Sequence, residues 1–489
     1  MKLRRRDFLT ALAGTGATLA LPACANAPER SLIPPLKPAQ SADGIVSRAG
    51  LGGDIAYTLL DMKNGNLLEG RGSNTPLPPA SVAKTITALY ALEKLGPDYR
   101  FATRLLATGP VQNGVLRGDL VLAGGGDPTL DTDALASLAA TLAQGGLRRV
   151  EGRFLVWGGA LPAVEQIADD QAVQAGYNPS VGGLNLNFNR VYFEWARQSN
   201  DYRVTMDARS DRFRPEVRLA QMQIANRASP LYTFRMARGR EQWSVARSAL
   251  GNSGSRWLPV RQPDLYAGEA FQALAAAQGI TLSAPARAST APQGQLLAQH
   301  RSDSLAEILR ATLRYSTNLS AESIGLSATV ASGTMPRDLS ASGAAMSAWA
   351  RARYGMTSLR MVDHSGLGAA SRVSMSDLAN MFHRAGRAGA IKPLLREHPF
   401  RDGNGRLLPN QPFEVRAKTG TLYFVSALAG YMRSPGGQDM AFAICSSDLR
   451  RRAQVVGSGQ DRPEGTAEWA RTARTMQQDL LYRWARAYS

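Results

Sequence analysis

The decisive stretch of this sequence is Pro79-Ala80-Ser81-Val82-Ala83-Lys84. The prolines at 78 and 79 suit the start of a helix, because proline is tolerated in the first helical turn. The apolar run at 85–92 could bury that helix against a core. Residues three apart share one helix face, so the hydroxyl of Ser81 and the amine of Lys84 can meet. We therefore predict a serine nucleophile with a lysine beside it.

Lysine is a functionally informative residue in this chain. A serine hydroxyl is a poor nucleophile until an adjacent base removes its proton. Lysine can be that base where burial or a positive field lowers its pKa, whereas arginine stays protonated. Only seven of the 57 basic residues are lysines, and Lys84 and Lys418 are among them. Both are candidates, although a lone Ser-x-x-Lys pattern usually lies on a solvated helix surface.

Length and composition indicate a globular protein with two or three domains. The chain has 489 residues, of which 44% are hydrophobic and 20% charged, which argues against disorder or several membrane spans. The net charge of +18 suggests an anionic environment such as nucleic acid, acidic lipid or an acidic polymer. The arginines are dispersed and no zinc-finger or RNA-binding signature occurs, so we expect no nucleic-acid partner. Four histidines without metal spacing, and only Cys24 and Cys445, predict no metal site and no disulfide framework.

The amino terminus has the pattern of an export signal. Arg5-Arg6-x-Phe8-Leu9 resembles a twin-arginine motif, and a short apolar run at 11–21 follows it. We take 1–27 as the signal, with cleavage after small residues, and expect a periplasmic protein. Alternatively, Leu21-Pro22-Ala23-Cys24 resembles a lipobox, although Pro22 fits it poorly. Cys24 would then carry lipid and attach the protein to a membrane.

Hydrophobic patterning divides the rest of the chain into nested parts. The segment at 28–50 contains four prolines and predicts a linker. A hairpin with a type I′ turn is expected around Asn64-Gly65, and a closing helix at about 465–487 after an arginine-rich loop. The predicted domains are a catalytic domain at 28–98 and 298–489, an inserted α/β domain at 99–297, and a β-rich subdomain nested within it at about 160–260.

Two further motifs follow the first one. Tyr315-Ser316-Thr317-Asn318 lies between two predicted helices, and Lys418-Thr419-Gly420-Thr421 enters a predicted strand. Singly, they could be a helix-capping turn and a strand exit. In this order with Ser81-x-x-Lys84, they form the serine–lysine acyl-transfer set of penicillin-binding proteins and serine β-lactamases, which the chain resembles. The resemblance implies an α/β (α+β) fold with an antiparallel sheet flanked by helices.

One branch of this superfamily is the better match. The long gap between Ser81 and Ser316 resembles that of the class C low-molecular-mass penicillin-binding proteins, which carry nested domains there. These are D-alanyl-D-alanine carboxypeptidase/endopeptidases. The segments at 124–130 and 177–187 also look like that family's insertion. At 363–367 the chain reads Asp-His-Ser-Gly-Leu where the family usually has Asp-Gly-Ser-Gly-Leu, so His364 is a departure.

The resemblance implies a catalytic role for five residues. Ser81 would attack the carbonyl of the penultimate D-alanine, with Lys84 as the base. Ser316 would pass a proton to the leaving D-alanine, and Asn318 would orient Lys84 and the peptide. Lys418 would bind the terminal carboxylate.

The resemblance also implies substrate contacts from the third motif. The hydroxyls of Thr419 and Thr421 would assist Lys418, and Gly420 lies between them. The backbone N–H groups of Ser81 and Thr421 would form the oxyanion hole, in which one donor typically contributes about 10²–10³ in rate. No metal or cofactor is required.

The expected ligands are peptidoglycan stem peptides and β-lactams. Asp169 and Asp170 are candidate partners for a free amine on the third stem residue, although such acidic pairs are usually solvated. No glutamate stands where class A β-lactamases have their deacylating base, so slow release of penicillin adducts is expected. Two alternatives remain: a β-lactamase or esterase of the same fold, and a catalytically silent cell-wall-binding scaffold.

Overall fold

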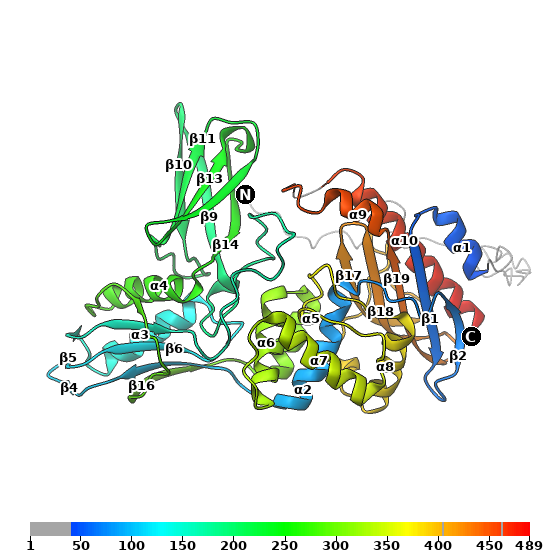
Figure 1. The fold of residues 1–489 in the computed structure, drawn as a ribbon, viewed down its shortest axis with the longest axis horizontal. Coiled ribbons are helices and arrows are strands. Elements are labelled where there is room, and N and C mark those ends of the chain that lie inside the picture. The colour runs from blue at the N-terminus through cyan, green and yellow to red at the C-terminus, as the bar shows by residue number, and fades with distance from the viewer. Residues whose placement is uncertain (1–40, 403–404, 461–462) are drawn as a thin grey trace, which may run out of the picture. The chain divides into compact units, whose positions relative to one another are not determined.

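The computed structural model describes residues 41–402, 405–460 and 463–489 (Figure 1). The predicted export signal at 1–27 and Cys24 lie outside these residues. Within the described part of the chain, no helix has both the length and the apolar character needed to cross a bilayer.

The first described element corrects the predicted linker at 28–50. Its last part is helical, because Ala42–Ala49 forms α1. The Oγ of Ser41 caps this helix by accepting the N–H of Gly44 at 3.1 Å. The apolar face of α1 is buried in a core shared with the final helix, so this segment belongs to the folded unit.

A five-stranded antiparallel sheet joins the beginning and the end of the chain. Its strand order is β17-β18-β19-β1-β2. In the pairing of β1 with β19, Asp54 lies opposite Ser447, so an early strand is completed by a late one. The antiparallel sheet predicted from the motifs is confirmed. The strands are β1 (Asp54–Asp61), β2 (Leu67–Arg71), β17 (Glu414–Leu422), β18 (Val425–Arg433) and β19 (Asp439–Ser447).

Helices cover both faces of this sheet (Figure 1). On one face, α10 (Thr466–Ala487) buries Trp469 and Trp484 against the strands, as its periodicity predicted. On the other face, apolar side chains of several helices form a second core. These helices are α2 (Ala83–Leu95), α5 (Leu305–Tyr315), α6 (Asn318–Ala331), α7 (Leu339–Tyr354) and α8 (Met375–Arg387).

The region between α2 and α5 forms a second sheet with the order β15-β8-β6-β3-β16. Helices α3 (Thr132–Gln144) and α4 (Pro263–Ala277) pack with it around a separate apolar core. Strand β16 pairs with β3 and runs to Arg301, four residues past the expected boundary at 297. The strands are β3 (Ala102–Ala107), β6 (Leu120–Gly124), β8 (Phe154–Trp157), β15 (Ala286–Arg287) and β16 (Gln295–Arg301); the short strands β4 (Val111–Gln112), β5 (Val115–Leu116) and β7 (Arg149–Val150) form a small sheet of their own.

Two small sheets occupy the segment predicted to be rich in strands. One has the order β10-β9-β14 and the other β11-β13-β12. The chain between β8 and β9 is mostly irregular, and this irregular segment supplies residues to the site described below. The strands are β9 (Arg190–Gln198), β10 (Asp201–Asp207), β11 (Ala220–Ala225), β12 (Tyr232–Ala237), β13 (Arg240–Ala246) and β14 (Ser253–Pro259).

Two local predictions are wrong. The hairpin between β1 and β2 forms, but its turn is not type I′, because φ is positive at Gly65 (77°) and not at Asn64. Instead, the N–H of Gly65 donates to the carbonyl of Asp61 at 2.8 Å and closes a longer loop. The arginine-rich loop predicted after β19 begins with a short helix, α9 (Leu449–Val455), capped by Asp448.

Candidate active site

Ser81 lies in a tight turn immediately before α2. The turn is a 3₁₀ segment, Ala80–Val82, and Ala80 has a φ of 46°, in the sparsely populated left-handed region. Two neighbouring glycines leave room for this turn. A Cβ at position 366 would clash with the carbonyl of Ala80, and a Cβ at position 420 would lie 3.0 Å from the backbone nitrogen of Ser81. The nucleophile is therefore held where strand β17 passes closely beside it.

Lys84 is fully buried one turn further along and contacts three acceptors. Its Nζ donates to the Oγ of Ser81 at 2.8 Å, to the Oδ1 of Asn318 at 2.8 Å and to the carbonyl of Ser365 at 2.9 Å. Burial lowers the pKa of Lys84 to about 8, while the charges of Glu322 and Asp363 oppose that shift. The predicted meeting of Ser81 with Lys84 is thus present in the structure.

Ser316 and Lys418 form a second serine–lysine pair. Ser316 ends α5 in a left-handed conformation, with φ of 60°, and its Oγ accepts a hydrogen bond from the Nζ of Lys418 at 2.9 Å. The same Nζ donates to the carbonyl of Thr419 at 2.6 Å. Burial, and then the charges of Lys84 and Arg396, hold the pKa of Lys418 well below its usual range.

Asn318 links the catalytic helices to the inserted region. Its side chain extends from the first residue of α6 and has two partners. The Oδ1 accepts from Lys84, and the Nδ2 donates to the carbonyl of Tyr177 at 2.9 Å. Tyr177 belongs to the irregular segment between β8 and β9, so a residue far away in the sequence fixes the orientation of this amide.

Four residues of the three motifs line one cleft of about 490 Å³: Ser81, Ser316, Asn318 and Thr421. Thr419 and Thr421 alternate with Lys418 and Gly420 along β17, so the two threonines share one face of the strand. Strand β17 is at the edge of its sheet. Residues 396–398 pair with the first half of its outer edge, where the N–H of Ala417 donates to the carbonyl of Arg396 at 3.2 Å. The edge after Ala417 can pair with an extended peptide, which is a common mode of peptide recognition.

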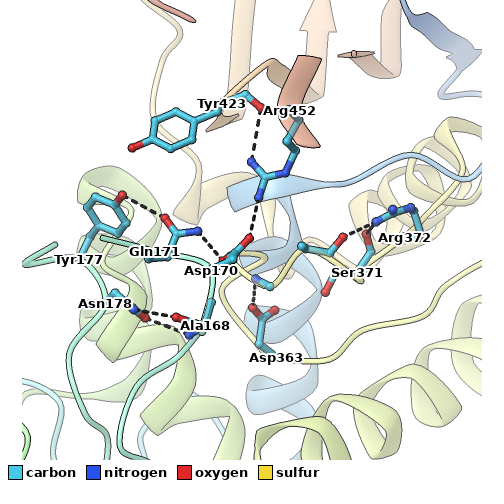
Figure 2. Close-up of polar contacts among 12 residues, drawn as sticks. Ala168, Asp170, Gln171, Tyr177, Asn178, Asp363, Ser371, Arg372, Tyr423 and Arg452 are labelled. Atoms are coloured by element: carbon cyan, nitrogen blue, oxygen red, sulfur yellow. Dashed lines mark hydrogen bonds and ion pairs between the residues drawn. The ribbon is translucent and has the colours of Figure 1, made fainter. Parts of the chain in front are cut away.

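The structure places Asp169 and Asp170 beside the cleft, but not among the residues that line it. Asp170 is engaged by two side chains: it accepts from Arg452 at 3.2 Å and from Gln171 at 2.6 Å (Figure 2). Asp169 is exposed and accepts from Gln166 at 2.8 Å. The two aspartates therefore differ, and only Asp170 belongs to a contact between the inserted segment and α9.

Several cleft residues were missed by the sequence analysis, among them three that join the inserted segment to α9. Gln171 and Tyr177 come from the inserted segment and Arg452 from α9. The hydroxyl of Tyr177 donates to the Oε1 of Gln171 at 3.0 Å, and Arg452 also donates to the carbonyl of Tyr423 at 3.4 Å (Figure 2). Arg452 stands in a run of arginines, and nothing in the sequence separates it from its neighbours.

Two buried acids near Lys84 were also missed. Glu322, on α6, accepts the N–H groups of His364 and Ser365, each at 2.8 Å. Asp363 accepts the N–H groups of Gly366 at 2.9 Å and Gly368 at 2.6 Å. Burial raises the pKa of both carboxyls, and the charge of Asp363 raises that of Glu322 further. Glu322 could have been predicted from its position, because it lies one turn after Asn318 on the same helix and therefore on the same face.

Residues 40–468 match the D-Ala-D-Ala carboxypeptidase 3 (S13) family. The chain belongs to this family. As an S13 member it is a serine D-Ala-D-Ala carboxypeptidase, related to penicillin-binding protein 4, in agreement with the activity implied by the three motifs.

Relatives of this S13 chain match it over most of its length. It is 28% identical to a D-alanyl-D-alanine carboxypeptidase from Actinomadura sp. (strain R39), over 83% of this chain and 80% of the relative. It is 24% identical to the D-alanyl-D-alanine carboxypeptidase DacB of Haemophilus influenzae, over 80% and 85% of the two chains.

The fold agrees with that of a solved S13 relative. The crystal structure of penicillin-binding protein 4 (dacB) from Haemophilus influenzae covers 90% of this chain and 99% of its own, with a TM-score of 0.73 at 21% identity. The predicted fold is therefore confirmed. A second structure of that protein contains a novel β-lactam, and its TM-score is 0.70.

Proposed function

We propose that this S13 chain cleaves peptidoglycan stem peptides through an acyl-enzyme on Ser81, and that penicillin acylates the same serine. The observation that carries the proposal is the position of the buried Lys84 Nζ, 2.8 Å from both Ser81 Oγ and Asn318 Oδ1. An ammonium group has three donors, and Lys84 has three acceptors around it. Once deprotonated, the amine directs a lone pair toward the serine hydroxyl.

Acylation transfers one proton from Ser81 to Lys84. The Oγ attacks the carbonyl carbon of the penultimate D-alanine, and the amide C–N bond breaks. The terminal D-alanine leaves as an amine that receives a proton through Ser316, and the carbonyl stays as an ester on Ser81. Water then cleaves this ester, which releases the shortened peptide and restores the hydroxyl.

The third motif, at 418–421, binds two negatively charged groups: the carboxylate of the leaving residue and the developing oxyanion. The carboxylate of the leaving residue binds at Lys418 with the hydroxyls of Thr419 and Thr421. The developing oxyanion accepts hydrogen bonds from the N–H groups of Ser81 and Thr421. The absence of a side chain at Gly420 lets β17 pass close to the backbone nitrogen of Ser81. Substrate bound along the edge of β17 after Ala417 presents its carbonyl to Ser81.

The residues that line the cleft are consistent with the expected slow release of penicillin adducts. None of its described lining residues carries a carboxylate. Glu322 lies near Lys84, but it does not line the cleft, and each of its two oxygens accepts a backbone N–H, from His364 and from Ser365. The site therefore lacks the type of base that activates water in class A β-lactamases.

We also propose that the protein works in the periplasm. This proposal rests on the twin-arginine pattern at 1–27 and on the net charge of +18, which would hold the enzyme near an anionic wall or membrane. The lipobox around Cys24 adds a lipid anchor as an alternative means of attachment.

Defined muropeptides test the proposal. The purified protein is incubated with a monomeric pentapeptide and with a cross-linked dimer, and the products are identified by mass spectrometry. Release of D-alanine together with covalent penicillin labelling supports it. Rapid turnover of a chromogenic cephalosporin would instead favour a β-lactamase, and failure to bind penicillin would favour a silent scaffold.

A further inference from the structure

A second groove, of about 670 Å³, lies beside the catalytic cleft on the α10 side of β17. Four arginines line it, and we call it the arginine groove. Two come from the segment before β17 and two from α10. They are Arg396, Arg401, Arg471 and Arg474.

The arginine groove is continuous with the site of catalysis. Thr421 and Arg474 line both the groove and the catalytic cleft, and Thr419 and Gly420 also line the groove. In the proposed mechanism these threonines bind the carboxylate of the leaving residue. Any part of a substrate that continues beyond that carboxylate therefore lies toward the arginine groove and away from the acylated half.

The charge of the groove is largely uncompensated. Its lining includes one carboxylate, Asp402, whose Oδ1 accepts the backbone N–H of Arg406. Within the described ranges, none of the four arginines is ion-paired with an acid, and Arg401 donates to the backbone carbonyl of Gly405 at 2.7 Å. Partial burial and the nearby charge of Arg471 lower the pKa of the Arg474 guanidinium. Crowded guanidinium groups form a local positive potential that attracts carboxylates, which they bind with paired hydrogen bonds.

The two substrate types place different amounts of charge in this groove. A terminal D-alanine has one carboxylate, and the third motif already accounts for it. In a cross-link, the leaving group is the amine of a second stem peptide, which carries further carboxylates along its chain. Only the cross-linked substrate has anionic groups that extend past Thr421.

We propose that the arginine groove binds the carboxylates of the second stem peptide and so makes cross-linked peptidoglycan a preferred substrate. This inference rests on the proposed function, because it takes the direction of the substrate from the roles of Ser81 and Lys418. It adds a binding site for the second stem peptide, whose amine is the leaving group. The three motifs do not account for such a site.

The test compares two substrates in two matched variants. Arg401→Gln/Arg471→Gln removes two exposed groove charges, neither of which lines the catalytic cleft or is among the charges that shift the pKa of Lys418. Arg387→Gln/Arg486→Gln removes two exposed arginines elsewhere and controls for loss of general charge. We measure kcat and KM separately for a cross-linked muropeptide dimer and a monomeric pentapeptide, together with the rate of penicillin acylation.

The groove variant should lose about two- to thirtyfold in kcat/KM on the dimer, mainly through KM, as expected for two exposed ion pairs. Its monomer activity and penicillin acylation should change by less than about twofold. Equal losses on both substrates, an equal loss in the control variant, or a parent enzyme that cleaves monomers but not dimers would overturn the inference. A parent that neither releases D-alanine nor binds penicillin would overturn the proposed function itself.

Discussion

His364 fills the space that Gly325 leaves open on α6. A Cβ at position 325 would overlap the imidazole ring, so a side chain at position 325 excludes the ring of His364 in its present position. The His364 ring is fully buried, lies 2.7 Å from Ser342 Oγ through Nε2, and has its pKa lowered to about 3 by burial. The departure from the family's usual glycine is therefore accommodated by a glycine on the facing helix.

This pairing predicts a destabilised Gly325→Ala variant. Alanine favours a helix by up to about 1 kcal/mol, but overpacking a core typically costs about 1–3 kcal/mol, and here the obstacle is a buried ring. We expect a lower free energy of unfolding by thermal or denaturant melting. Gly251→Ala is the control, because a Cβ there meets nothing within 4 Å. Gly325→Ala/His364→Gly should recover most of the loss; a double variant as unstable as Gly325→Ala would contradict the pairing.

Ser81→Ala should abolish penicillin labelling and D-alanine release. The substitution removes the hydroxyl that receives a hydrogen bond from Lys84, while α2 and its buried face stay unchanged. Labelling is measured with a tagged penicillin, and the fold is checked by circular dichroism. Retained labelling at another serine would refute the assignment of the nucleophile.

Lys84→Arg should reduce acylation by several orders of magnitude. Arginine keeps the positive charge but cannot accept a proton near neutral pH. The measurement is the second-order rate of penicillin acylation in a variant shown to be folded. An acylation rate within about tenfold of the parent would mean that position 84 supplies charge only, and that the base is elsewhere.

The acylation rate should rise with pH and level off above about 8. The pKa of Lys84 is lowered from its ordinary value to about 8, and only the neutral amine can take the serine proton. Below that pKa the neutral fraction grows about tenfold for each pH unit. Penicillin acylation followed between pH 6 and 9.5 gives the profile. A flat profile in the parent would argue against Lys84 as the base.

Neutralising Asp169 and Asp170 separates substrate binding from structural support. If they bind a free amine, Asp169→Asn/Asp170→Asn should lower kcat/KM for amine-bearing stem peptides and leave a di-D-alanine mimic almost unchanged. Asp170→Asn should have most of the effect, because Asp170 contacts Arg452 of the cleft whereas Asp169 is exposed. Equal losses on both substrates would assign the pair to the fold, through the contact with Arg452.

The sequence predicted contacts that depend on local geometry or on a shared set of motifs. Ser81 and Lys84 meet because three residues span one helical turn. Ser316 and Lys418 were placed by resemblance, and the structure joins them at 2.9 Å. Arg452 was not predictable, because its place in the cleft depends on how α9 packs against an irregular inserted segment. No periodicity encodes such a tertiary contact.

The hydrogen bond from Asn318 to Tyr177 limits which parts of this enzyme can be deleted without loss of activity. An inserted domain is often regarded as an accessory that could be deleted or exchanged while the remaining scaffold keeps working. Here the insertion's own backbone carbonyl holds the amide whose other end contacts Lys84. A minimal enzyme made by excising the insertion would free that amide to rotate. The inserted region and the catalytic domain should therefore be treated as one catalytic unit when the protein is truncated or engineered.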